Sequence, residues 1–94
     1  MRHYIAVLIP DDEVGWRAHF PDLPGCRAEA RDVDVAVARA SNAASELVGK
    51  LLLNGSPPMP RTLEEIRADE AWAAERSINW TKALISVVPV STPD

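Results

Sequence analysis

Trp16-Arg-Ala-His-Phe-Pro-Asp-Leu-Pro-Gly-Cys26 is the most informative part of the sequence. Its first five residues alternate apolar and polar side chains, which predicts a strand with one dry face. Pro21 and Pro24 interrupt the strand because proline has no N–H to donate, and Gly25 can adopt backbone angles that other residues avoid. The stretch therefore predicts a strand, a tight corner and the start of a second strand.

Outward from this corner, the chain continues as a meander. Cys26–Arg31 alternates again between small apolar and charged residues, and Arg2–Ile9 is apolar on both faces. The acidic segment Pro10–Gly15 supplies the turn between the first two strands. We expect three antiparallel strands at Arg2–Ile9, Trp16–Phe20 and Cys26–Arg31. The first strand is expected to be central, or to meet a partner with its outer face.

A long helix is predicted after the meander. Asp32 is a candidate N-cap, with a side chain that would accept from free N–H groups of the first turn. Apolar residues repeat at helical spacing from Val33 to Leu52, and Asn54-Gly55 supplies the stop. A helix of about 21 residues would be about 30 Å long, enough to cover a small sheet. Its alanines would let it lie close to the strands.

The C-terminal third predicts a connector, a short helix and a last strand. Ser56–Pro60 is a stiff proline-rich connector, and Thr62 with Glu65 forms the pattern of a capping box. The short helix is expected to run unevenly to Glu75. Ile78–Val90 is the predicted last strand, with its strongest β pattern over Ala83–Val88.

Together these elements predict an α+β fold with two layers in the order β-β-β-α-β. One long helix would cover one face of a four-stranded mixed sheet, with a short second helix beside it. The last strand is expected next to the first, through a right-handed crossover. Residues 1–94 are expected to form a single domain. The predicted core is Trp16, Ala18, Phe20, Cys26, Ala28 and Ala30 against Val37, Ala40, Ala44, Leu47 and Leu51.

Composition and charge limit the function classes. The chain has 94 residues, 47% of them hydrophobic, and a net charge of −4. That charge argues against binding nucleic acid alone, because phosphate binding needs clustered Lys and Arg. It suits a basic protein partner, and it is also ordinary for a cytosolic protein. The apolar run Ile5–Ile9 is too short for a signal peptide or a membrane span, so we expect a cytoplasmic protein.

The sequence offers no catalytic or metal-binding constellation. Cys26 is the only cysteine and falls on an apolar face, which favours a buried structural thiol. No group of His, Cys, Asp or Glu has metal-ligand spacing. The element order is similar to part of the ribonuclease H fold, whose cleavage needs acids on the first and fourth strands. Arg2–Ile9 and Ala83–Val90 contain no Asp or Glu, so we expect no enzyme, no metal and no cofactor.

The motif Phe20-Pro-Asp-Leu-Pro-Gly-Cys26 resembles the signature of HicB-type antitoxins, the partners of HicA ribonuclease toxins. The resemblance continues through the first strand with its acidic turn, the alanine-rich helix, the Gly55–Pro60 connector and the final strand. It implies a partial ribonuclease H-like domain that masks a toxin and oligomerises. Full-length members usually continue into a DNA-binding domain. No such C-terminal domain is expected within residues 1–94, so operator binding is not carried over.

We therefore expect a non-enzymatic HicB-like antitoxin that binds and neutralises a HicA-type, mRNA-cleaving toxin. The alternative is a solitary oligomeric interaction or ligand-binding module without a toxin. The predicted partner-binding residues are Arg17, His19, Asp22, Arg27 and Glu29, with the acidic set Asp11, Asp12, Glu13 and Asp22 around the turns. A homodimer or tetramer is expected. Its predicted interface is Ile5, Val7, Ile9, Ile85 and Val87.

Overall fold

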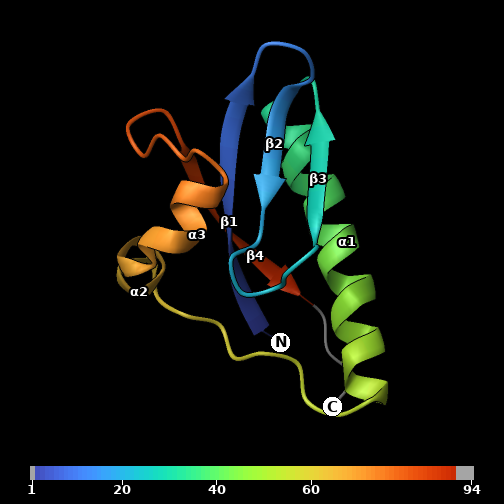
Figure 1. The fold of residues 1–94 in the computed structure, drawn as a ribbon. Coiled ribbons are helices and arrows are strands. Elements are labelled where there is room, and N and C mark those ends of the chain that lie inside the picture. The colour runs from blue at the N-terminus through green and yellow to red at the C-terminus, as the bar shows by residue number, and fades with distance from the viewer. Residues whose placement is uncertain (1, 91–94) are drawn as a thin grey trace.

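The structure is a computed structural model that describes residues 2–90, and its first three strands form the expected meander (Figure 1). Strands β1 (Arg2–Asp11), β2 (Gly15–His19) and β3 (Arg27–Ala30) pair antiparallel in chain order. The corner between β2 and β3 turns the chain back, so that Ala18 lies opposite Ala28. The alternation around this corner therefore predicted both the strands and their pairing.

The fourth strand, β4 (Leu84–Val90), lies beside β1, as expected, but it runs antiparallel to β1. It also begins six residues later than the predicted strand Ile78–Val90, because residues 78–83 form turns and a connector. The sheet has the order β3-β2-β1-β4 and every pair in it is antiparallel, so the prediction of a mixed sheet was wrong. A strand that followed the long helix directly would have run parallel to β1. The segment 54–83 instead carries the chain around to the opposite end of the sheet before β4 begins (Figure 1).

The long helix α1 (Val33–Leu53) has 21 residues and covers one face of the sheet. Asp32 is its N-cap, but the Asp32 side chain makes no capping hydrogen bond, so that part of the prediction was wrong. The helix ends at Asn54 as expected, and Gly55 follows with a φ of 142°.

The core lies between α1 and the inner face of the sheet. The predicted core residues all belong to this cluster or pack against it. The fully buried helix positions are Ala36, Ala40, Ala44 and Val48. Leu47 and Leu51 are only partly buried beside them, so the buried stripe is narrower and richer in alanine than the apolar pattern suggested. Small side chains at these positions let α1 approach the strands closely.

Two short helices, α2 (Leu63–Ala68) and α3 (Glu70–Glu75), form the uneven helical region. The capping box at Thr62 and Glu65 is present as predicted. Asp69 ends the first helix and caps the second, because its side chain accepts from Trp72 N at 3.1 Å. No helix among residues 2–90 is long and apolar enough to cross a membrane.

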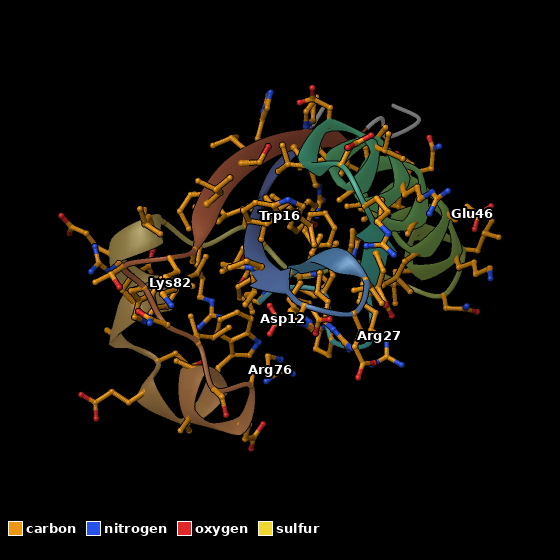
Figure 2. All side chains as sticks on the ribbon, turned by 90° about the horizontal axis from the view of Figure 1, so that it is seen from above. Asp12, Trp16, Arg27, Glu46, Arg76 and Lys82 are labelled. Carbon is orange, nitrogen blue, oxygen red and sulfur yellow. The ribbon has the colours of Figure 1, made fainter. Side chains whose placement is uncertain are left out.

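These short helices also bury part of the second face of the sheet. Val7 points away from the core formed with α1, yet it is fully buried. Ile66 of α2 and Trp72 of α3 are buried outside that core as well. Figure 2 shows α2 and α3 across the sheet from α1. We infer that α2 and α3 cover the outer face around Val7, so the expectation of helical cover on one face only was incomplete.

Candidate functional site

The corner between β2 and β3 is anchored by three buried apolar side chains. Phe20, Leu23 and Cys26 are at most 8% exposed. Leu23 N donates to Phe20 O at 3.2 Å and Cys26 N donates to Leu23 O at 3.0 Å, which closes two consecutive tight turns. Burial raises the pKa of the Cys26 thiol, which fits its predicted structural role. The corner therefore holds the ends of both strands at a defined spacing.

Asp22 lies in this corner, and its buried carboxylate binds Arg61. Its side chain is 4% exposed and accepts hydrogen bonds from both Arg61 N, at 2.7 Å, and Arg61 Nε. Arg61 also reaches the Pro21 carbonyl and the Asp69 carboxylate, each at 3.3 Å. Asp22 was predicted to bind a partner. In the structure, its side chain instead binds Arg61 and so links the connector before α2 to the corner.

The other four predicted partner-binding residues share the polar face of the β2–β3 hairpin. Arg17 is paired across the strands with Glu29, and His19 with Arg27. The structure thus brings together four of the five, from two strands. We call Arg17, His19, Arg27 and Glu29 the hairpin face.

In the turn next to this face, the carboxylate of Asp11 is occupied by hydrogen bonds from its neighbours. Asp11 Oδ1 accepts from Glu13 N at 2.8 Å and Val14 N at 3.0 Å, and its Oδ2 accepts from Arg17 Nε at 2.8 Å. These bonds, first the one from Val14, lower the pKa of Asp11. Because β1 extends to Asp11, the first strand does hold one carboxylate at its end, but hydrogen bonds within the turn occupy it. Asp12 and Glu13 remain exposed.

A pocket of about 440 Å³ opens between the hairpin face and the end of α3. It is lined by His19, Phe20, Gly25, Cys26, Arg27, Glu75 and Arg76. The last two were not among the predicted site residues. No spacing or motif in the sequence links them to the hairpin, since only the path of the chain after α1 brings α3 to this place. A smaller pocket of about 280 Å³ lies on the α1 side of the corner.

The predicted interface residues lie on the outer face of β1 and β4. Ile5 is paired with Val87, and Val7 with Ile85. Val87 is 59% exposed and Ile85 is 39% exposed, whereas Val7 is fully buried within the chain. Ile9 is partly buried. The exposed apolar surface is therefore concentrated on β4, which is an edge strand.

Within residues 2–90, no three His, Cys, Asp or Glu side chains are grouped so that they could hold a metal ion. The β4 strand contains no carboxylate. Residues 2–90 thus form a polar hairpin face beside a pocket, and they show no group of acids of the kind that metal-dependent cleavage needs.

A comparison with protein families identifies one family. A family model described as the HicB-like antitoxin of bacterial toxin-antitoxin systems matches residues 4–92. No curated protein matches the chain.

Three solved structures share the fold. The N-terminal domain of the Burkholderia pseudomallei antitoxin HicB has a TM-score of 0.72 at 20% identity, over 96% of this chain and 99% of that one. A toxin-antitoxin complex from Streptococcus pneumoniae has a TM-score of 0.75 at 21% identity, over 95% of this chain and 68% of that one. A complex of HicA3 and HicB3 has a TM-score of 0.64 at 17% identity, over 96% of this chain and 99% of that one.

Proposed function

The chain belongs to the HicB-like antitoxin family of bacterial toxin-antitoxin systems, and we propose that it binds and neutralises a HicA-type toxin that cleaves mRNA. The match over residues 4–92 carries this proposal, because it spans the corner, the sheet and the helices. A structure of the same fold is a complex of HicA3 with HicB3, which supports a partner of the HicA type. The role of an antitoxin agrees with the expectation that the chain is not an enzyme.

We further propose that residues 1–94 act as one toxin-binding domain in the cytoplasm, where a toxin against mRNA would work. Pairing of the first strand with the last supports a single folded unit over the described residues.

Electrostatic recognition would use one end of the sheet. The turn after β1 and the segment before α1 lie at the same end (Figure 1). They are in close contact, since a Cβ placed on Gly15 would lie 2.6 Å from Arg31 O. The exposed carboxylates at this end are Asp12 and Glu13 in the turn, Asp32 before α1, and Asp34 in the first turn of α1. We call these four residues the acidic end, and we propose that it attracts a basic toxin while the neighbouring hairpin face makes further contacts. Charge complementarity would mainly raise the association rate.

The experiment is co-expression with any small basic reading frame that lies beside this one, followed by a pull-down and a growth-rescue assay. We expect co-purification and rescue. The double variant Asp12→Lys/Glu13→Lys should slow association and reduce its salt dependence. Glu64→Lys/Glu70→Lys is the matched control, because it makes the same charge change at exposed positions on α2 and α3.

Equal effects of the two charge reversals would remove the acidic end from the proposal. Failure to bind any neighbouring product would favour the second candidate, a solitary oligomeric module. The exposed Ile85 and Val87 on β4 favour oligomerisation in either case. We propose a homodimer, or a tetramer made from two dimers, with the outer face of β1 and β4 as the interface. Val7 lies on the same face but is buried within the chain, so Ile85 and Val87 would form the exposed part of this interface.

A further inference from the structure

The pocket between the hairpin face and α3 concentrates positive charge on a chain that is acidic overall. His19 and Arg27 enter it from β2 and the start of β3, and Arg76 enters it from the end of α3. Figure 2 shows Arg27 beside β3 and Arg76 beside α3. Glu75 is the one carboxylate in the lining. Its side chain is 75% exposed, and its contact with Arg76 is long, at 3.4 Å. Two guanidinium groups and an imidazole therefore dominate the pocket.

Arg76 is held in place by its neighbours. Its guanidinium carbon lies 4.9 Å from the centre of the Trp72 ring, and its Nη1 donates to Trp72 O at 3.2 Å. Trp72 is itself 9% exposed and packs near Trp80, with 6.4 Å between ring centres. Arg76 Nη1 also donates to Glu75 Oε2 at 3.4 Å, whereas Nε and Nη2 have no hydrogen-bond partner within residues 2–90 and can donate to an anion. A guanidinium held in this way loses little side-chain entropy when it binds a ligand.

Arg27 supplies the second positive charge. Its side chain is exposed, and within residues 2–90 it forms no ion pair. Arg17, the other arginine of the hairpin face, is bound to Asp11 instead. Arg27 and Arg76 thus offer planar sets of N–H donors from two separate elements, which is the geometry that suits a group with several anionic oxygens.

His19 lies between these charges. Partial burial, followed by the positive charges of Arg76, Arg27 and Arg17, lowers the pKa of His19, and the Glu29 carboxylate raises it slightly. The imidazole is therefore neutral at pH 7 and has one N–H to donate. An anion in the pocket would oppose the arginine charges and favour the protonated form.

We propose that this pocket binds the phosphate group of a small phosphate monoester, with Arg27, Arg76 and His19 as its donors. The volume of about 440 Å³ suits a molecule of mononucleotide size and exceeds what one carboxylate side chain would fill. An RNA strand is disfavoured, because only two of the ten Lys and Arg residues line the pocket and the chain has a net charge of −4. This site goes beyond antitoxin activity and does not depend on a toxin.

The test is a heteronuclear NMR titration of the full chain with adenosine 5′-monophosphate. Saturable shifts are expected at the amides of His19, Gly25 and Arg27, and adenosine without its phosphate should produce none. The His19 ring signals should titrate at higher pH when the ligand is bound. Arg27→Gln should weaken binding at least tenfold without unfolding the protein, because this side chain is exposed.

Arg39→Gln is the matched control. Arg39 is an exposed arginine of α1 that donates to Glu29 O at 2.9 Å and does not line the pocket. Unchanged binding is expected for this variant. Inorganic phosphate, an acidic peptide and a ten-nucleotide single-stranded RNA without a terminal phosphate form the other arms. The proposal is overturned if no ligand gives saturable shifts, if adenosine binds as well as its monophosphate, if both arginine variants weaken binding equally, or if the RNA or the peptide binds more tightly.

Discussion

At the scale of single residues, the ion pair of Asp22 with Arg61 connects two distant parts of the chain. Asp22 belongs to the corner after β2, and Arg61 belongs to the connector before α2. A buried carboxylate is costly unless it is paired and hydrogen-bonded, and Asp22 receives two N–H groups of the same arginine. The pair therefore helps to hold α2 and α3 beside the hairpin.

Arg61→Ala should lower the free energy of unfolding by about 3 kcal/mol, because it leaves the buried carboxylate of Asp22 without its charged partner. Urea unfolding at pH 7 measures this loss. Arg39→Ala is the control, since it removes an exposed arginine with one hydrogen bond. The double variant Asp22→Asn/Arg61→Ala should lose less than the sum of the single variants. Equal midpoints for the wild type and Arg61→Ala would contradict a stabilising role for the pair.

Gly15 and Gly25 provide a matched pair of glycines. Both have a positive φ, 98° and 84°, which disfavours any other residue. A Cβ on Gly15 would also meet Arg31 O at 2.6 Å and Arg31 Cα at 2.7 Å, whereas nothing lies within 4 Å of a Cβ on Gly25.

Gly25→Ala should therefore cost about 1 kcal/mol of stability from the backbone alone. Gly15→Ala should cost more than about 2 kcal/mol, because the backbone of Arg31 must also shift. Thermal and urea unfolding of both variants measure the difference. Similar losses for the two variants would mean that the contact between the turn and Arg31 is unimportant.

At the scale of elements, short hydrogen-bonded turns and caps depend on ionised carboxylates. The hydrogen bond from Trp72 N, followed by the one from Arg61, lowers the pKa of Asp69. Hydrogen bonds from the backbone and side chain of Thr62 lower the pKa of Glu65. Asp11 is affected in the same way in the turn after β1. The ordinary values are 3.8 for Asp and 4.5 for Glu. Each group is therefore protonated more readily in the unfolded chain than in the folded one.

These three carboxylates contribute fully to the free energy of unfolding above pH 4.5. The contribution should be lost as the pH falls below that value and passes through the lowered pKa values of the folded chain. We expect the melting temperature to decrease between pH 4.5 and pH 3. Glu65→Gln should reduce the size of this decrease, and Glu64→Gln, an exposed neighbour outside the capping box, should not. A melting temperature that stays constant down to pH 3 would rule out this dependence.

At the scale of the whole molecule, part of the outer face of the sheet leaves apolar side chains exposed to solvent. α2 and α3 leave Ile85 and Val87 exposed on an edge strand. Edge strands with apolar side chains favour pairing with another chain. Assembly through this face would bury residues that the monomer leaves in water.

Val87→Glu should convert the expected dimer or tetramer to a monomer, because a charge at the interface would be desolvated without a partner. Sedimentation velocity over a range of concentrations measures the change. Leu53→Glu is the control, since Leu53 is 86% exposed at the end of α1, away from this face. A wild type that sediments as a monomer at all concentrations would contradict the proposed assembly.

The inner core and most of the helices and strands could be predicted from local periodicity, although the start of β4 could not. Alternation along β2 and β3 and helical spacing along α1 each decide which side chains share a face. The capping box at Thr62 and the stop at Asn54-Gly55 were also visible, since caps depend on a few neighbouring residues. Asp32 shows what such local patterns do not predict. It occupies the N-cap position of α1, but its side chain makes no capping hydrogen bond.

The direction of β4, the ion pair of Asp22 with Arg61 and the pocket that contains Arg76 follow from long-range contacts instead. All three depend on the path of residues 54–83, which pass around the sheet before the last strand. The local sequence pattern does not encode that path, because the same residue types allow the connector to leave α1 in several directions. Contacts between residues far apart in sequence, such as the Asp22–Arg61 pair and the cover over Val7, select one of them.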